Sequence, residues 1–394
     1  MKNVIAVALA LIILLSAGCW DMREINEIGF VMAVGVDRAD DTGQFTVTVQ
    51  IANPSAEGSK TEKAAKQSVW VASADGPSIF EAIRKLVRIS SKRIVWAHNN
   101  VVIIGEPLAR DGITPVIDFF THNPELRMKT GLVVARGNAG DYLYAKAGME
   151  DIPGVSMSEM GRYRSLIAET VESDLLRVSY DYNNEYSEPL ISGVSLKKVI
   201  ITPENGKASS ETEIIELSGA AVFKKNKMTG WLTPEETRGL AWVRNETRNT
   251  VVTVTDPEHE NRSVSVETRG VKSKIYSQVE GGVPYITIAV SGAGNIVEED
   301  GHTTLDIEEM KDHIEGLISE KIAGEIETSI YKIQKEYNSD VLHFSRAINV
   351  QNDEEWDSEI KDNWQGIFPQ IPVTVLVDIN IKTSTLYQEP RKKI

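Results

Sequence analysis

Short runs of apolar residues, some alternating with polar ones, predict β-strands in the first third of the chain. Residues 45–51 (FTVTVQI) alternate with a period of two, which is typical of a strand with one buried face. Residues 101–104 and 131–135 are continuous apolar runs, as expected of strands buried on both faces.

Helical periodicity lies between these strands. Ser78 and Glu81 have the spacing of a capping box, and apolar residues then recur at helical intervals to about Ile89. A second helix is expected over 113–121, before the break at Asn123–Pro124. Strands and helices thus alternate from 28 to 146, which predicts an α/β layer built on a mixed sheet.

The middle of the chain is predicted to be rich in strands. The aperiodic stretch 181–193 (DYNNEYSEPLISG) has the composition of a domain boundary. Beyond it, strands are expected at 194–202, 213–223 and 251–255, around a helix at 233–243 that Thr233 and Glu236 begin as a second capping box.

The last third combines a hairpin with a long helix. Residues 264–276 and 285–290 are expected to pair across the turn at 280–282, and an apolar stripe from Met310 to Tyr337 predicts an amphipathic helix. Residues 373–381 alternate most clearly of all. A helix laid across a small antiparallel sheet satisfies these patterns.

We therefore predict an α+β protein of three domains. The expected divisions are a signal peptide at 1–18, an N-terminal mixed α/β domain at 19–190, a small strand-rich middle domain at 191–262, and a C-terminal domain at 263–394 in which a long helix covers an antiparallel sheet.

The N-terminus predicts export and an anchor. Val4–Leu15 is wholly apolar and follows Lys2, as in a secretory signal, and is too short to cross a bilayer, which takes roughly 20 residues. Small residues 16–18 precede Cys19, the only cysteine, and this resembles a bacterial lipobox in which the thiol receives diacylglycerol. The alternative is that Cys19 is a small buried hydrophobe.

Charge narrows the choice of partners. Without residues 1–18 the chain has 41 basic and 57 acidic residues, a net charge of −16. A surface this acidic favours neither nucleic-acid binding nor electrostatic adhesion to a membrane, so we expect attachment through acyl chains and protein contacts. A lone cysteine also permits no disulfide within the chain.

No pattern of catalytic residues is found. Glycine spacings fit neither a nucleotide-binding loop nor a nucleophile elbow, and the six histidines form no metal motif. Glu309 with His313, and the acidic run 298–300, are better explained as an exposed pair and a solvated turn. We expect no catalytic residue, no cofactor and no metal.

Residues 230–242 (GWLTPEETRGLAW) form the candidate docking segment. Trp231 and Trp242 are potential interface anchors, and Glu236 and Arg238 are expected to be exposed helix charges whose replacement by alanine changes stability by no more than about 0.5 kcal/mol. The alternative is that both tryptophans fill a core.

Motifs along nearly the whole chain resemble the Ger(x)C family, the C subunits of spore nutrient-germinant receptors. They are CWDMREINEIG with VGVDR (34–38), SIFEAIRKLVRISSKRIVWAHNNVVIIGEPLARDGI (78–113), DFFTHNPELRMKTGLVVARGNAGDYL (118–143), SGAAVFKKNKMTGWLTPEETRGLAWV (218–243) and DNWQGIFPQIPVTVLVDINIKTS (362–384).

This resemblance implies a lipoprotein on the outer face of the spore's inner membrane. It implies two integral-membrane partners, the A and B subunits, a role in the response to nutrient germinants, a three-domain α+β fold and no known catalytic activity. Cys19 would be the lipidated residue, and Asp21, Arg23 and Glu24 a charged collar beside it that contacts partners. The alternatives are a solute-binding lipoprotein of a transport system and, less favoured, a secreted wall hydrolase.

Overall fold

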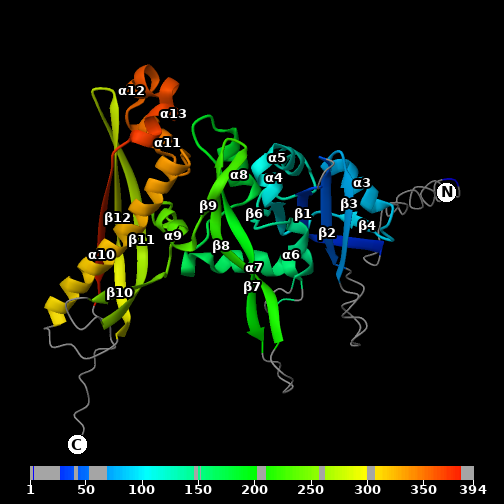
Figure 1. The fold of residues 1–394 in the computed structure, drawn as a ribbon, viewed down its shortest axis with the longest axis horizontal. Coiled ribbons are helices and arrows are strands. Elements are labelled where there is room, and N and C mark those ends of the chain that lie inside the picture. The colour runs from blue at the N-terminus through cyan, green and yellow to red at the C-terminus, as the bar shows by residue number, and fades with distance from the viewer. Residues whose placement is uncertain are drawn as a thin grey trace, which may run out of the picture.

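The molecule is elongated, with two β-sheets that follow one another along its long axis (Figure 1). The structure is a computed structural model that describes residues 3, 27–39, 43–52, 69–145, 150, 152–201, 210–256, 262–299 and 307–382. The predicted signal sequence lies outside these residues apart from Asn3, and so do Cys19, Asp21, Arg23 and Glu24.

The first sheet has nine strands in the order β3-β2-β1-β5-β6-β7-β8-β9, with β4 beside β1. Its centre, from β1 through β5 and β6 to β7, is parallel, and its two sides are antiparallel, so the predicted mixed sheet is confirmed. The strands are β1 (Ile28–Arg38), β2 (Phe45–Ala52), β3 (Val69–Gly76), β4 (Arg93–Val95), β5 (Val101–Gly105), β6 (Gly131–Ala135), β7 (Leu190–Ile201), β8 (Ser210–Lys224) and β9 (Lys227–Leu232).

Helices cover both faces of this sheet, which is why its central strands are continuously apolar. Val102 and Ile104 of β5 pack with α3, α5 and α8, whereas Val101 and Ile103 pack on the opposite face with α6 and α7. The helices are α3 (Ile79–Val87), α4 (Glu106–Asp111), α5 (Thr114–Thr121), α6 (Ala139–Tyr144), α7 (Pro153–Ile167) and α8 (Leu175–Asn183).

The second sheet has the order β10-β11-β12-β13, and the long helix α10 packs against it. The hairpin of β11 and β12 turns at Gly281 and Gly282, which both have positive φ (58° and 79°). Ile314, Ile318 and Ile322 on the predicted stripe are buried. The elements are β10 (Val251–Asp256), β11 (Arg262–Glu280), β12 (Val283–Glu299), α10 (Ile307–Tyr331), its π-helical continuation η3 (Lys332–Glu336), and β13 (Val373–Ile381).

The expectation that this sheet is wholly antiparallel is wrong. β13 pairs with β12 in parallel, from Ile286 opposite Val373 to Gly294 opposite Ile381. Parallel neighbours need a long crossover connection. Here α10 and the helices after it form that crossover, and they return the chain to the same end of the sheet.

The crossover ends in short helices packed around an aromatic cluster. Trp364 lies 5.4 Å from Trp356 and 5.6 Å from Phe368 between ring centroids, and Tyr186 packs edge-on against Trp356 at 5.0 Å. Trp364 Nε1 donates to the Tyr186 carbonyl (3.1 Å), so the cluster ties these helices to the segment before β7. The helices are α11 (Phe344–Gln351), α12 (Asp353–Glu355), η4 (Trp356–Ile360), η5 (Lys361–Asn363), α13 (Trp364–Ile367) and η6 (Phe368–Gln370).

The strands expected in a separate middle domain are divided between the two sheets. β7, β8 and β9 extend the first sheet, whereas β10 belongs to the second, and α9 (Pro234–Val243) connects them. Hydrogen-bonded pairing therefore crosses both predicted domain boundaries, at 190 and at 262. The aperiodic stretch 181–193 contains the end of α8 and the start of β7.

Candidate functional site

The helix that connects the two sheets begins as its sequence predicts. The Glu236 backbone N–H donates to Thr233 Oγ1 (3.2 Å), and the Thr233 backbone N–H donates to Glu236 Oε2 (2.8 Å), which completes the capping box. Pro234 occupies the first turn, where its missing N–H costs no hydrogen bond. α9 is therefore fixed at its N-terminus, directly after β9.

α9 lies against α10 at very short range because a glycine faces the contact. A Cβ atom at Gly239 would collide with Ser329 Oγ and with the backbone carbonyl of Glu325. Ser329 Oγ lies 2.7 Å from the carbonyl oxygen of Glu236, so the two helices also share a hydrogen bond. This approach brings charged side chains of both helices together.

Glu325 is the centre of that charged group. Its Oε2 accepts from Arg238 Nε (3.0 Å) and from Trp242 Nε1 (3.0 Å), and its Oε1 accepts from the second guanidinium nitrogen of Arg238. The residue is only 8% exposed. A buried carboxylate is tolerated when it is paired and hydrogen-bonded, and this fork of donors meets that requirement.

Arg238 also reaches a third element. Its NH1 lies 3.8 Å from Glu169 Oε1, in the segment that follows α7. Burial alone would lower the pKa of Arg238, but the hydrogen bond and charge of Glu325 raise it above its ordinary value. Arg238 is thus a permanent cation that links α9 to α10 and to the first half of the chain.

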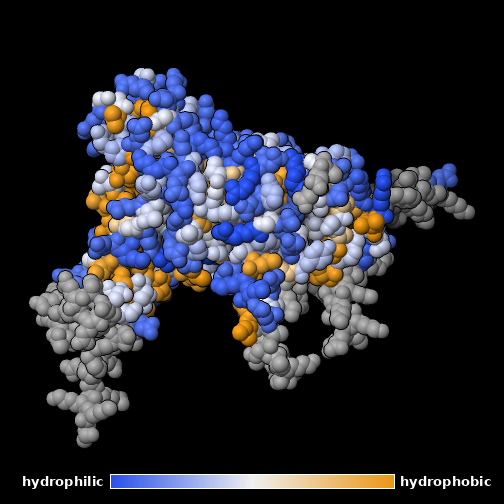
Figure 2. Space-filling view, in the orientation of Figure 1, coloured by the Kyte–Doolittle hydropathy of each residue, from blue (hydrophilic) through white to orange (hydrophobic). Residues whose placement is uncertain are grey.

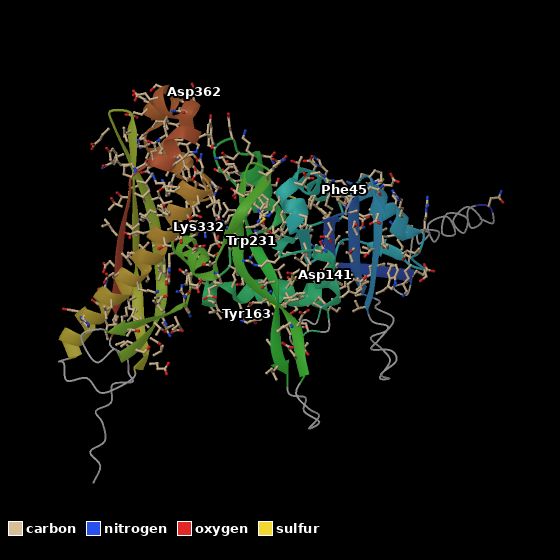
Figure 3. The ribbon with its side chains drawn as sticks, in the orientation of Figure 1. Phe45, Asp141, Tyr163, Trp231, Lys332 and Asp362 are labelled. Carbon is tan, nitrogen blue, oxygen red and sulfur yellow. The ribbon has the colours of Figure 1, made fainter. Side chains whose placement is uncertain are left out.

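A second ion pair and a tyrosine extend the contact. Lys332 Nζ lies 2.8 and 3.0 Å from the two carboxylate oxygens of Glu236, and Tyr337 Oη donates to the carbonyl of Trp231 (2.9 Å). The guanidinium of Arg136 lies 4.3 Å from the centroid of the Trp231 ring. Trp231 and Lys332 lie where the two halves of the molecule meet (Figure 3).

We call this group the α9–α10 joint: Trp231, Glu236, Arg238, Trp242, Glu325 and Lys332. It corrects part of the docking interpretation. Trp242 is completely buried, so it fills the core and offers no surface to a partner. Arg238 and Glu236 are not free surface charges, because Arg238 forms an ion pair with Glu325 of α10 and Glu236 forms one with Lys332 of η3.

The partners on α10 were not identifiable from the sequence pattern. Glu325 and Ser329 each precede a buried isoleucine of the stripe, and Lys332 and Tyr337 lie beyond the last turn of α10. The sequence contains one signal for a close contact between these helices. Polar residues lie beside the apolar stripe of α10, and a glycine lies inside the short helix α9.

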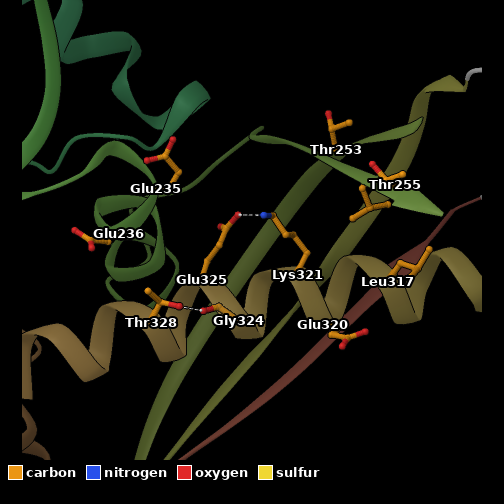
Figure 4. A pocket seen from close by; sticks show the side chains of 11 residues that line it. Glu235, Glu236, Thr253, Thr255, Leu317, Glu320, Lys321, Gly324, Glu325 and Thr328 are labelled. Carbon is orange, nitrogen blue, oxygen red and sulfur yellow. Dashed lines mark hydrogen bonds and ion pairs between the residues drawn. The ribbon is translucent and has the colours of Figure 1, made fainter. Parts of the chain in front are cut away.

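A groove of about 670 Å³ lies beside the joint, between α9, β10 and α10. Figure 4 shows Glu325 and Lys321 of α10 below α9, with Thr253 and Thr255 on β10 across from Leu317. Glu235 and Glu320 are exposed at its rim, so carboxylates outnumber Lys321. β10 is also an edge strand of its sheet. The lining of the groove therefore combines carboxylates and hydroxyl groups with a single lysine.

A second polar contact joins α8 to α11. Asp340 lies before α11 and caps its N-terminus, because its carboxylate accepts from the backbone N–H groups of Phe344 (2.8 Å) and Ser345 (2.9 Å). His343 Nε2 lies 3.5 Å from Asp181 Oδ1 and its Nδ1 lies 3.1 Å from Ser187 Oγ. Burial lowers the pKa of His343 to about 4 and raises the pKa values of Asp181 and Asp340 to about 6.

Within the residues that the structure describes, no three His, Cys, Asp or Glu side chains gather as a metal site requires. Of the helices that the structure describes, none is both long and apolar enough to cross a bilayer.

Comparisons with known proteins cover most of the chain. A family model described as the spore germination protein N-terminal domain matches residues 21–196, and one described as spore germination B3/GerAC-like, C-terminal, matches residues 218–385. Spore germination protein KC of Bacillus subtilis (strain 168) is 27% identical over 402 residues, which span 99% of this chain and 98% of that protein. Spore germination protein B3 of the same organism is 27% identical over 361 residues, 90% of each chain. The crystal structure of the GerBC protein shares the fold, with a TM-score of 0.57 and 22% identity over 88% of this chain and 96% of that one.

Proposed function

Because this chain belongs to the Ger(x)C family of spore germination proteins, we propose that it is the lipid-anchored, non-enzymatic subunit of a germinant receptor and that spores need it to respond to nutrients. Its partners would be the two integral-membrane subunits, of A and B type. It would be held on the outer face of the spore's inner membrane through acyl chains on Cys19.

The observation that carries this proposal is the match of both halves of the chain, in order, to two spore germination domains. The lipobox-like sequence at Cys19 supports the anchor, since a diacylglyceryl group supplies the two acyl chains that stable attachment takes. The contacts at the α9–α10 joint support a structural role, because its charged residues pair with one another and so hold the two halves of the molecule together.

A solute-binding lipoprotein is less well supported. Such a protein should have two doubly wound lobes with a cleft between them. In the described residues the first sheet has helices on both faces, whereas the second is a four-stranded sheet packed against α9, α10 and α11. The two halves therefore differ in architecture.

The anchor is tested by the mass of the mature N-terminus purified from the native membrane. We expect a chain that begins at acylated Cys19, and a Cys19→Ala variant that folds normally but carries no acyl chain and no longer supports germination by nutrients. A mature chain that begins elsewhere, or one that begins at Cys19 without acyl chains, would contradict the proposal.

A further inference from the structure

The outer face of α3 exposes apolar side chains at one end of the molecule. Phe80, Val87 and Ile89 are 54%, 50% and 59% exposed, although they belong to a helix and turn whose other face is buried against the first sheet. α3, β3 and β4 lie at the end of the long axis opposite the second sheet (Figure 1). Figure 2 shows apolar surface at this end among polar residues.

The same segment is basic within an acidic protein. Between 79 and 93 it has Arg84, Lys85, Arg88, Lys92 and Arg93 and a single acid, Glu81, whereas the whole chain has a net charge of −15. Lys85 Nζ lies 3.7 Å from Glu81 Oε1 and donates a hydrogen bond to the backbone carbonyl of Asp75 (2.8 Å).

In contrast to Lys85, the three arginines of this segment are available to bind an anion. Within the described residues Arg84, Arg88 and Arg93 make no ion pair, and all three are exposed. Arg84 instead lies 4.8 Å from the centroid of the Phe80 ring, so cation and aromatic ring stand together on the outer face.

Aromatic side chains continue this surface between α3 and α5. An open groove of about 590 Å³ is lined by Phe80, Arg84, Val87, Trp96 and Phe119, among others. Glu125 also lines this groove, and its carboxylate accepts a hydrogen bond from the backbone N–H of Trp96 (3.2 Å). We call the surface formed by Phe80, Arg84, Val87, Arg88, Ile89 and Arg93 the α3–β4 face.

The α3–β4 face lies beside the start of the fold. Arg93 of β4 pairs with Ile28 of β1 in parallel. Ile28 is nine residues after Cys19, and nine residues span at most about 32 Å even when fully extended. If Cys19 carries the acyl chains, this end of the molecule cannot move far from the bilayer surface.

We propose that the α3–β4 face binds the anionic phospholipid headgroups of the membrane in which Cys19 is anchored. This inference rests on the proposed lipid anchor and adds an orientation to it. The arginines pair with lipid phosphates while Phe80, Val87 and Ile89 enter the interface, as in other peripheral membrane surfaces. The second sheet then lies at the end of the molecule farthest from the bilayer. The net charge of the whole chain gave the opposite expectation because it averages over this local cluster.

Vesicle sedimentation tests the proposal on the chain from residue 19 onward, with Cys19→Ser so that no acyl chain contributes. All strands and helices of both sheets lie within residues 27–382, so this chain keeps the whole described fold. We expect binding to phosphatidylcholine vesicles that contain phosphatidylglycerol, weaker binding at high salt, and little binding to phosphatidylcholine alone.

A pair of matched variants locates the binding surface. Each basic residue near an anionic surface contributes about fivefold in affinity, so Arg84→Gln/Arg88→Gln should weaken binding about 25-fold. Lys272→Gln/Lys274→Gln removes two exposed charges from β11 and should change it less than about twofold. Unchanged melting temperatures would show that both variants fold.

Absence of binding, binding that does not depend on phosphatidylglycerol, or equal effects of the two variants would overturn the proposal. Because this chain is unacylated, such a result leaves the anchor at Cys19 to its own test. If Arg84→Gln/Arg88→Gln binds vesicles normally but fails to associate with the receptor subunits, the α3–β4 face is a protein interface and the lipid proposal is wrong.

Discussion

Gly239 sets the distance between α9 and α10. In an ordinary exposed helix, replacing glycine by alanine stabilises by about 1 kcal/mol. At Gly239 the added methyl group would meet Ser329 Oγ and the Glu325 backbone, which cannot move without displacing α10. We therefore predict that Gly239→Ala lowers the free energy of unfolding by about 1–3 kcal/mol, the usual cost of overpacking.

Gly316 and Gly324 on α10 provide the control. A Cβ atom at either position would meet nothing within 4 Å. Gly316→Ala should therefore stabilise the protein by up to about 1 kcal/mol. Denaturant titration of the two variants should give shifts of opposite sign; shifts of the same sign would contradict the close contact at Gly239.

Arg238 compensates a buried charge, so its loss should be costly. Arg238→Ala leaves Glu325 without its main cation, and removing one partner of a buried pair typically costs about 3–5 kcal/mol. From its position on a predicted exposed helix face, this residue is expected to change stability by no more than about 0.5 kcal/mol. The comparison is Arg162→Ala, which breaks an exposed pair with Glu159 (3.1 Å) and should cost less than about 1 kcal/mol.

Equal melting temperatures for Arg238→Ala and Arg162→Ala would show that the Arg238–Glu325 pair does not stabilise the joint. Replacing both partners, as in Arg238→Met/Glu325→Leu, should restore part of the loss, because no buried charge then remains unpaired.

The residues of the joint show which interactions a sequence predicts. The capping box of Thr233 and Glu236 is local, with both partners inside one turn, and it was predicted and is present. Arg238 and Glu325 are 87 residues apart, and nothing in either segment specifies the other. Short-range chemistry could be predicted, whereas long-range pairing came only with the tertiary structure.

At the scale of elements, periodicity predicted those with one clearly buried face. β2, β5, β6, α3 and β13 begin and end close to the predicted residues, and so does α10 together with its continuation η3. α7 was missed because its sequence (PGVSMSEMGRYRSLI) has no apolar stripe, and only its first turns are buried. The direction of β13 was missed because alternation defines the buried face of a strand and says nothing of its neighbour.

α11 begins at a group of titratable residues, which predicts a dependence of stability on pH. The pKa of His343 falls from 6.5 to about 4 on folding, so the unfolded chain binds more protons in this range. The contribution of His343 is complete above about pH 6.5 and is lost as the pH falls toward 4.

Comparison of wild type with His343→Gln isolates this effect. Asp181 and Asp340, whose raised pKa values act in the opposite direction, are present in both proteins. The stability of wild type relative to the variant should decline by at most about 1.4 kcal/mol per pH unit between pH 6.5 and 4. Urea titrations across this range measure it; a difference that does not change with pH would show that His343 is not held neutral by the fold.

At the scale of the molecule, the strands could be predicted better than their grouping. Every strand expected between 194 and 255 is present in the structure. Of the four strands described in this region, β7, β8 and β9 join the first sheet and β10 joins the second. An edge strand offers unpaired backbone groups to whichever strand comes next, and side-chain patterns do not identify that strand. The division into three domains remains a prediction, while the hydrogen bonds define two sheets.

Along the long axis of the molecule, the α3–β4 face is at one end, the second sheet is at the other, and the α9–α10 joint lies between them (Figure 1). Paired, buried charges at the joint leave its residues little freedom, so we expect the two sheets to act as one body.

We propose above that this chain works as a subunit of a membrane receptor. Its most direct test is affinity purification of the full-length, natively processed protein from detergent-solubilised spore inner membranes, with mass spectrometry of what accompanies it. We predict that two integral-membrane proteins of the germinant receptor, of A and B type, co-purify in constant ratio. Recovery of the protein alone, or with the permease of a transport system, would show that it is not a germinant receptor subunit.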